Sequence, residues 1–262
     1  MPRFSANLSL LFTELPLLER FSAARECGFR GVEIQFPYEA PAEHIKAQID
    51  LTGLELVLIN VPAGDLMNGG EGLAAVPSKR HDFIDAVNKA AEYADILRPK
   101  LINVLPGRCF ETDRLDQYME TFTSNLVHAA DVFLDQGIKA VFEAVNTKDM
   151  PGFLIHNSEQ LVQVLEELQH SNVYLQYDIY HMQTMGEDHH AFFHRHAERV
   201  GHIQFADAPG RHQPGTGQID FVNLFNAIDA SGYQGWIGAE YRPSVPTRDS
   251  LDWLAHYCQP PA

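Results

Sequence analysis

The sequence predicts an α/β protein that forms a single (β/α)8 barrel, the TIM-barrel fold, as one domain over residues 1–262. Short apolar segments alternate with longer amphipathic segments along the whole chain, which is typical of a parallel sheet covered by helices. Eight strand–helix units can be counted, and a closed barrel of this kind usually needs about 250 residues. No change in composition marks a second domain.

Eight segments have the length and the apolar character of buried strands. They are residues 3–9, 31–36, 54–61, 100–107, 139–146, 173–182, 202–209 and 235–241. The segments between them predict helices over residues 16–28, 42–53, 78–97, 113–137, 158–169, 188–200, 221–232 and 248–257. Pro, Ser or Asp begins several helices and Gly ends several, as helix termini prefer. Ser78 and Ser158 are the expected N-caps of two of them.

The composition is that of an ordinary globular protein, with 45% apolar and 21% charged residues. The formal net charge of −16 argues against nucleic acid or an anionic membrane as a partner, because Lys and Arg neutralise phosphate groups. No apolar run reaches the ~18 residues that a membrane-spanning helix needs. A small molecule is therefore the expected partner, and assembly into a homo-oligomer is left open.

The cysteines predict a reducing environment. Cys27, Cys109 and Cys258 are widely spaced and odd in number, so they indicate neither a disulfide framework nor a zinc site. The first residues lack the charged and apolar pattern of a secretory leader. Together these features favour a cytoplasmic protein.

Polar side chains gather where the predicted strands end, which in this fold is where active sites form. Four successive strands each carry an oxygen donor within or at the end of an apolar run. These are Glu143, Asp178, Gln204 and Glu240. Three converging carboxylates repel each other unless a cation or shared protons lie between them. Oxygen donors suit Mg²⁺ or Mn²⁺ better than zinc, and a bound ion would explain a carboxylate in a buried strand.

Other polar residues admit more ordinary interpretations. His181 follows Asp178 at a strand exit, but a lone histidine there is also compatible with the core. Glu33 lies early in its strand and is expected to form an ion pair inside the barrel. The segment EDHHAFFHRH is interpreted as a polar helix face, and the Gly- and Pro-rich residues 62–77 as a lid over the site.

The sequence resembles the hydroxypyruvate isomerase family, which belongs to the larger group of xylose isomerase-like barrels. The resemblance extends from Phe4 to about Trp253 and rests on seven motifs. They are RFSANLSLLF, CGFRGVE, PAGD, PGF, LQYDIYHMQ, PGTGQID and GYQGWIGAEY. It implies that Glu143 and Glu240 act as proton donor and acceptor. It also implies a divalent-metal site formed by the four oxygen-donor residues named above.

The reaction implied by this resemblance interconverts hydroxypyruvate and tartronate semialdehyde through an enediolate. Two carboxylates beside the substrate can remove and return the proton, and a cation can stabilise the enediolate oxygen. For this reaction we expect His181 to donate to a substrate oxygen and Arg211 to hold the substrate carboxylate. Asn7 and Asn60 are expected to bind hydroxyl groups. The reaction is redox-neutral, so no nucleotide cofactor is needed.

Three alternatives stay open at this stage. In the first alternative, the protein is an isomerase whose substrate is a related 2-oxo-tetronate or a ketose sugar. The second is phosphodiester cleavage, because some barrels of this superfamily repair DNA, but the net charge of −16 argues against it. The third alternative is a binding protein without catalysis. The polar residues that converge from four strand ends argue against it.

Overall fold

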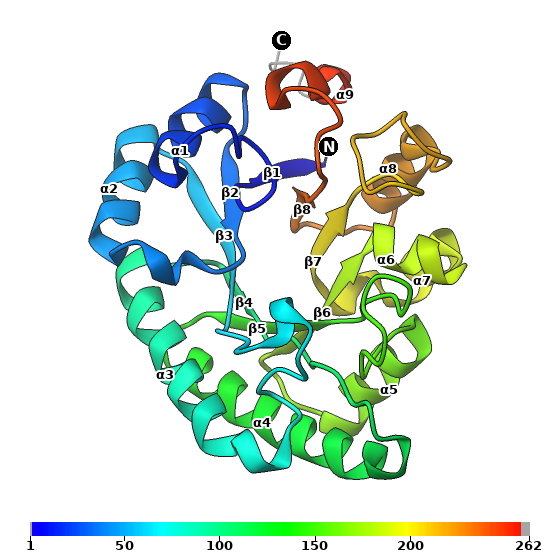
Figure 1. The fold of residues 1–262 in the computed structure, drawn as a ribbon. Coiled ribbons are helices and arrows are strands. Elements are labelled where there is room, and N and C mark those ends of the chain that lie inside the picture. The colour runs from blue at the N-terminus through cyan, green and yellow to red at the C-terminus, as the bar shows by residue number, and fades with distance from the viewer. Residues whose placement is uncertain (1, 258–262) are drawn as a thin grey trace.

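The computed structural model describes residues 2–257 and forms a closed barrel of eight parallel strands inside a ring of helices (Figure 1). The strands are β1 (Arg3–Asn7), β2 (Gly31–Ile34), β3 (Glu55–Asn60), β4 (Leu101–Asn103), β5 (Lys139–Glu143), β6 (Val173–Asp178), β7 (Val200–Phe205) and β8 (Trp236–Ala239). They lie around the barrel in chain order, and β8 pairs with β1. The predicted (β/α)8 barrel is confirmed.

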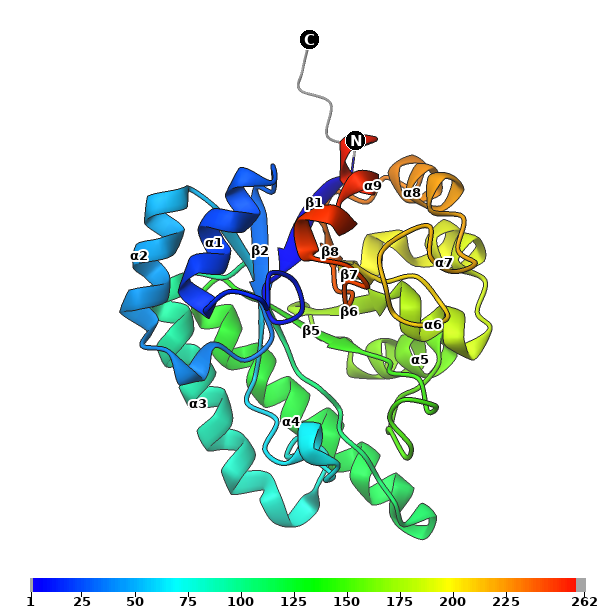
Figure 2. The same ribbon diagram turned by 45° about the horizontal axis from the view of Figure 1, so that its top comes forward.

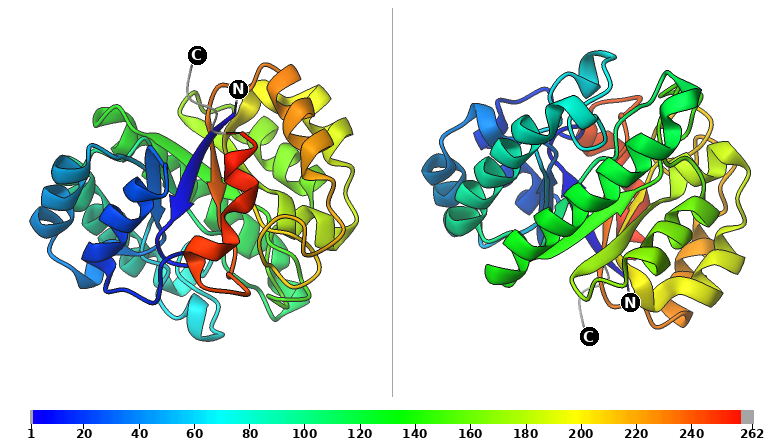
Figure 3. Two further views of the ribbon diagram at one scale, coloured as in Figure 1. Left: turned by 90° about the horizontal axis from the view of Figure 1, so that it is seen from above. Right: turned by 90° about the horizontal axis from the view of Figure 1, so that it is seen from below.

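Helices occupy the outer ring, as Figure 3 shows from two opposite directions. They are α1 (Leu17–Glu26), α2 (Ala42–Thr52), α3 (Arg80–Leu97), α4 (Leu115–Asp135), α5 (Ser158–Leu168), α6 (Ile179–Met185), α7 (His189–His196), α8 (Phe221–Ala230) and α9 (Asp252–Ala255). The short α9 lies between α1 and α8. Its Trp253 packs edge-on against Phe4 and Phe205, which closes the ring next to β1.

The end of the sixth strand differs from the prediction. Residues 173–182 were expected to form one strand, but β6 ends at Asp178 and α6 begins at Ile179. The Asp178 carboxylate caps this helix by accepting hydrogen bonds from the backbone N–H groups of Tyr180 and His181. The apolar run continues from strand into helix, so its periodicity could not mark the boundary.

Both predicted N-caps are wrong. Helix α3 begins after Lys79 with no side-chain cap, and Ser78 lies in the preceding 3-10 turn, Pro77–Lys79. Asn157 caps α5 by accepting a hydrogen bond from the Gln160 N–H. Ser158 is the first helical residue and donates instead to Glu187. Asn and Ser are about equally good caps, so sequence preference alone could not choose between these neighbours.

Two apolar layers hold the barrel together. The larger one lies between the strands and the outer helices. A smaller cluster fills the barrel interior at its amino-terminal end and consists of Val57, Leu58, Leu101, Val141 and Trp236, with Tyr174 packed against it. This apolar plug occupies the amino-terminal end, and the acidic residues Glu143 and Asp178 lie at the opposite ends of their strands.

The segment 62–77 is fixed by polar contacts in this structure. The Asp65 carboxylate accepts from the Gly72 N–H and pairs with Lys79. Glu71 accepts from the Tyr118 hydroxyl, and its backbone carbonyl accepts from the Arg108 N–H. These contacts join the segment to the loop after β4 and to the first turn of α4. Figure 2 shows the segment beside α4. Its role as a lid stays a prediction.

The remaining expectations concern α7, the cysteines and the membrane. In α7, His190 and His194 are exposed as predicted, but His189 is buried against Tyr177. Cys27 and Cys109 are free thiols, and Cys258 lies outside the described residues. Across residues 2–257 no helix has both the length and the apolarity to cross a bilayer.

Candidate active site

The candidate site is built from residues on neighbouring strands that point into the barrel. Alternate residues of a strand face the same side of the sheet, so residues at matching positions on neighbouring strands face the interior together. Asp178 on β6 pairs in register with Gln204 on β7, and Gln204 pairs with Gly238 on β8. Glu143 ends β5, and Glu240 directly follows β8. All four predicted oxygen-donor residues are buried at the carboxyl-terminal end of the barrel.

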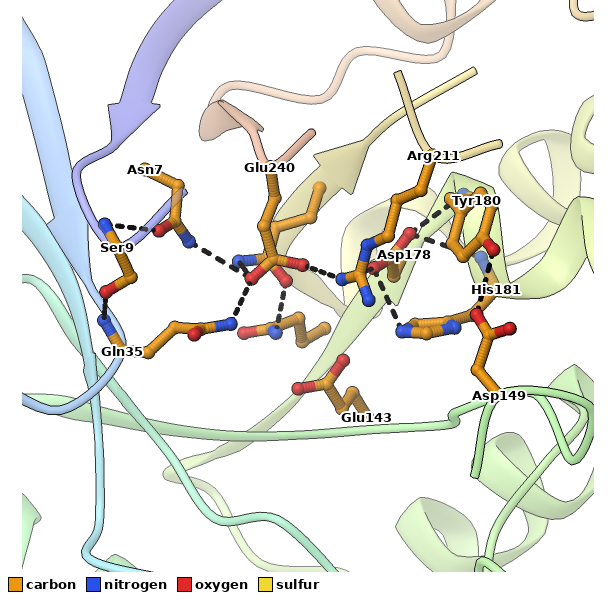
Figure 4. A network of polar contacts seen from close by, with 12 residues as sticks. Asn7, Ser9, Gln35, Glu143, Asp149, Asp178, Tyr180, His181, Arg211 and Glu240 are labelled. Carbon is orange, nitrogen blue, oxygen red and sulfur yellow. Dashed lines mark hydrogen bonds and ion pairs between the residues drawn. The ribbon is translucent and has the colours of Figure 1, made fainter. Parts of the chain in front are cut away.

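Glu240 is the most highly connected carboxylate of the site (Figure 4). Its Oε1 accepts hydrogen bonds from three side-chain amides, those of Asn7 at 3.0 Å, Gln35 at 2.8 Å and Gln204 at 3.1 Å. Its Oε2 pairs with Nη2 of Arg211 at 2.6 Å. Neutral amide donors and one guanidinium therefore fix the plane of this carboxylate.

Glu143 faces the same space from the opposite side, as Figure 4 shows. Its Oε1 accepts from Nδ2 of Asn103 at 2.7 Å. Burial, followed by the negative charges of Glu240 and Asp178, raises the pKa of Glu143 well above its usual range. A buried carboxyl with a raised pKa is suited to hold and return a proton near neutral pH.

Asp178 and Arg211 lie between these two glutamates and the helix α6. Nη2 of Arg211 is 3.8 Å from Oδ2 of Asp178. The Arg211 guanidinium also lies over the ring of Tyr180, with 5.1 Å between Cζ and the ring centroid. The backbone of Arg211 has a φ of 58°, an unusual value for a residue other than glycine, and its loop is held by backbone bonds to Asp207 and Arg242. The Arg211 side chain thus points toward Asp178 and Glu240.

The tautomer of His181 follows from its neighbours. Oδ1 of Asn146 accepts the backbone N–H groups of Lys148 and Asp149, which leaves Nδ2 of Asn146 to face Nδ1 of His181 at 2.6 Å. Nδ1 must then be the acceptor, so a neutral His181 carries its proton on Nε2. Nε2 lies 3.5 Å from Oδ2 of Asp178. Burial lowers the pKa of His181 to about 4, so the ring is a neutral hydrogen-bond donor at neutral pH.

Two further residues predicted to bind substrate have different surroundings. Asn7 lies inside the site, where its Nδ2 contacts both Glu240 and Glu33. Asn60 ends β3 beside Asn103, and its Oδ1 is buried without a hydrogen-bond partner among the described residues. Asn60 is therefore placed at the correct end of the barrel and has an unused acceptor.

Several contacts of the site were missed at the sequence level. The hydrogen bonds from Gln35 to Glu240 and from Asn103 to Glu143 were not predicted. The available signal was a polar residue within each of two mainly apolar predicted strands, residues 31–36 and 100–107. Tyr180 and Asp149 had no such signal, because their hydrogen bond at 2.8 Å joins α6 to the loop after β5.

The site has features of a divalent-cation site. Glu143, Asp178 and His181 are buried and offer ligand atoms that all lie within 4.8 Å of one another. Three carboxylates and one guanidinium leave two negative charges uncompensated when all are ionised. Gln204 at present directs Nε2 toward Glu240, while its Oε1 accepts from Gln176 at 2.7 Å. This buried cluster of two carboxylates and a histidine is therefore suited to bind a cation.

A pH dependence of stability follows from Glu240. Burial raises the pKa of Glu240 to about 7, opposed by Arg211 and reinforced by Asp178 and Glu33. Between the usual pKa near 4.5 and this value, the native state keeps a proton that the unfolded state has lost. We expect the metal-free protein in EDTA to lose free energy of unfolding as the pH rises from 5 to about 7. Denaturant titrations should show a shallower decrease for Glu240→Gln, and parallel curves would contradict this assignment.

Comparisons with known proteins place the chain in a family. The family described as "Xylose isomerase-like TIM barrel" matches residues 21–257. Hydroxypyruvate isomerase of Escherichia coli is 40% identical over 257 residues, covering 98% of this chain and 100% of that protein. The 2-oxo-tetronate isomerase of Cupriavidus necator is 39% identical over 258 residues, covering 98% and 99%.

A solved structure shares the fold of this chain over nearly its whole length. The crystal structure titled "AP endonuclease, family 2" from Brucella melitensis is 38% identical, with a TM-score of 0.94, and the match covers 98% of this chain and 99% of that one. Similarity therefore extends over the strands, the helices and the segments that carry the site. The chain belongs to the hydroxypyruvate isomerase family, within the xylose isomerase-like TIM barrels.

Proposed function

We propose that this protein is an isomerase that interconverts hydroxypyruvate and tartronate semialdehyde. The observation that carries the proposal is the placement of two buried glutamates, Glu143 and Glu240, on opposite sides of one polar space at the end of the barrel. The name of the Escherichia coli relative supports the choice of substrate.

The reaction moves one carbon-bound proton and one carbonyl group. A base removes a proton from C3 of hydroxypyruvate, and the C–H electron pair forms the C2–C3 double bond of an enediolate. An acid then adds a proton to C2, while the proton of the C3 hydroxyl passes to the C2 oxygen, so that the C3 oxygen becomes the aldehyde and the C2 oxygen becomes a hydroxyl. Glu143 and Glu240 are assigned to the two carbon sites, because each is buried and has a raised pKa.

The remaining polar residues are assigned to the oxygen atoms. The neutral His181 presents an N–H that can donate to the oxygen that gains charge in the enediolate. Arg211 is assigned to the substrate carboxylate, since a guanidinium binds a carboxylate through two parallel hydrogen bonds. Its Nε is buried without a partner among residues 2–257, so it has an unused donor. Asn7 and Asn60 are assigned to hydroxyl groups.

We assign Mg²⁺ or Mn²⁺ to Glu143, Asp178 and Glu240. Gln204 was predicted as a fourth oxygen ligand, but its Oε1 accepts from Gln176 and its Nε2 faces Glu240, so in this orientation it is not assigned to the ion. Such an ion supplies Lewis-acid stabilisation of negative charge on oxygen. Asn103, Asn7 and Gln35 orient the two glutamates through their side-chain amides.

Removing divalent ions is expected to lower turnover by about 100-fold or more, because Lewis-acid stabilisation contributes several kcal/mol. Protein dialysed against a chelator and checked by elemental analysis should regain activity with Mg²⁺ or Mn²⁺. Calorimetric titration with Mn²⁺ should give one site per chain. Full turnover by verified metal-free protein would contradict the assignment of the ion.

A second candidate substrate is 2-oxo-tetronate. The Cupriavidus necator relative with that name is almost as similar to this chain as the hydroxypyruvate isomerase is. A four-carbon 2-oxo acid has the same carboxylate, carbonyl and adjacent hydroxyl groups. The test is kcat/KM for hydroxypyruvate, 2-oxo-tetronate and a ketose panel. A ratio of at least tenfold in favour of hydroxypyruvate supports the main proposal, and the reverse ratio overturns it.

We also infer a cytosolic location and a small molecule as the reaction partner. The sparse cysteines and the net charge of −16 support this interpretation. Failure of the protein to bind a polyanion column at low salt would agree with it, and tight retention would favour a nucleic-acid substrate.

A further inference from the structure

A further acidic residue, Glu33, lies next to Glu240 inside the barrel. Its side chain is fully buried on β2. Its Oε2 is 2.6 Å from Nε2 of His202 on β7, whose side chain is also fully buried. His202 is thus the partner expected for Glu33 inside the barrel. Neither residue belongs to the acid/base pair or to the residues assigned to the substrate.

Two side-chain amides connect Glu33 to Glu240. Nδ2 of Asn7 lies 3.3 Å from Oε1 of Glu33 and 3.0 Å from Oε1 of Glu240. Nε2 of Gln204 lies 3.2 Å and 3.1 Å from the same two oxygens. Two carboxylate oxygens and two NH₂ groups therefore alternate in one closed ring of hydrogen bonds. An NH₂ group has two hydrogens, so each amide can serve both carboxylates.

The orientation of both amides is fixed from outside this ring. Oδ1 of Asn7 accepts the backbone N–H of Ser9 at 3.0 Å, and Oε1 of Gln204 accepts from Gln176 at 2.7 Å. Their NH₂ groups must then face the carboxylates. Glu33 is thus contacted at both of its carboxylate oxygens.

The protein leaves room for this carboxylate at Gly238 on β8. A Cβ atom at position 238 would collide with the carboxyl group of Glu33. His202 holds the other oxygen, and its Nδ1 is buried without a hydrogen-bond partner among the described residues. Nε2 of the imidazole faces Glu33. Glu33 is held by hydrogen bonds from two strands, β1 and β7, and has little freedom to turn.

We propose that Glu33, anchored by His202, is a positioning residue that sets the orientation of the Glu240 carboxylate through Asn7 and Gln204. This inference rests on the proposed function only for its kinetic consequence. Glu143 has no such support from Glu33, since its bonded amide is that of Asn103. The two glutamates are therefore positioned by separate groups, and they should be separable by mutation.

The experiment uses Glu33→Gln with Asn103→Leu as the matched variant. We measure exchange with D₂O at C3 of hydroxypyruvate and at C2 of tartronate semialdehyde by NMR, beside kcat, KM and Tm. For Glu33→Gln we expect kcat to fall about 10- to 100-fold, as is typical for residues behind a reactive group, with KM within about twofold. One of the two exchange rates should fall with kcat, and the other should stay near the wild-type value. Asn103→Leu should show the opposite selectivity.

A purely structural role for Glu33 would lower both exchange rates together with Tm, and this result would overturn the proposal. His202→Gln and His202→Leu provide a second test if Glu33→Gln folds poorly. Glutamine retains a donor for Glu33 and should keep most of the activity, whereas leucine should reproduce the selective loss. Equal activity of these two variants would also overturn the proposal.

A crystal structure of Glu33→Gln separates this inference from the proposed function. Rotation of the Glu240 carboxylate, with loss of at least one amide bridge, supports positioning even if wild-type protein neither exchanges nor converts hydroxypyruvate. An unchanged Glu240 carboxylate contradicts positioning. Inactivity of the wild type, in contrast, counts against the substrate assignment.

Discussion

Glutamine at position 143 or 240 is expected to leave a folded protein with about 10²- to 10⁴-fold lower kcat, the usual contribution of a general acid or base. Glutamine has nearly the same shape as glutamate but cannot accept and return a proton. In Glu143→Gln the new amide oxygen could still accept from Asn103, and in Glu240→Gln it could accept from Asn7 and Gln35. Far-UV circular dichroism and Tm should therefore stay close to those of the wild type.

Glu55→Gln is the matched control for these two variants. Glu55 begins β3 at the amino-terminal end of the barrel, where it pairs with Lys100 at the protein surface. Its loss should change neither kcat nor KM, because an exposed ion pair contributes at most about 1 kcal/mol. Retention of full turnover by both Glu143→Gln and Glu240→Gln would refute the acid/base assignment.

Asp178 is expected to show two separable roles. Asp178→Asn should keep the helix cap, since asparagine is as good an N-cap as aspartate, while removing one negative charge from the site. Asp178→Ala should lose both and unfold with about 1 kcal/mol less stability than Asp178→Asn. We expect both variants to lose Mn²⁺ binding and to lower turnover by about 100-fold or more, since each lacks an anionic ligand.

The comparison of these two variants distinguishes the cap from the ligand. Denaturant titration measures the first role, and calorimetric titration with Mn²⁺ measures the second. Asp188→Asn is a suitable control, because Asp188 caps α7 in the same way at the surface. Normal Mn²⁺ affinity in Asp178→Asn would show that Asp178 is present only as a helix cap.

The sequence predicted the barrel because its strands are short, apolar and separated by helices with recognisable ends. It did not predict helix α6, because the apolar run from Val173 to Met182 suits a strand and a helix equally well. A single hydrogen-bonding side chain, that of Asp178, decides where one ends and the other begins. Such a decision depends on burial and geometry that composition does not contain.

The acidic residues of the site could be predicted because they lie at the ends of the strands. Residues that end parallel strands meet at one end of a barrel, so the acidic residues could be grouped from their positions alone. Contacts between loops could not, and the bond from Asn146 to His181 is an example. The direction of the Gln204 amide was also beyond the sequence, since Gln176 on the neighbouring strand determines it.

The central claim is that the carbon-bound proton passes through two glutamates, and conversion of hydroxypyruvate in D₂O tests it most directly. At early conversion, with a control without enzyme, NMR should show tartronate semialdehyde carrying deuterium at C2. Glu143→Gln and Glu240→Gln should each block a different half of the exchange. Product whose C2 carries a hydrogen transferred from C3 and no solvent deuterium would mean a direct hydride shift between the carbons, and it would contradict the account.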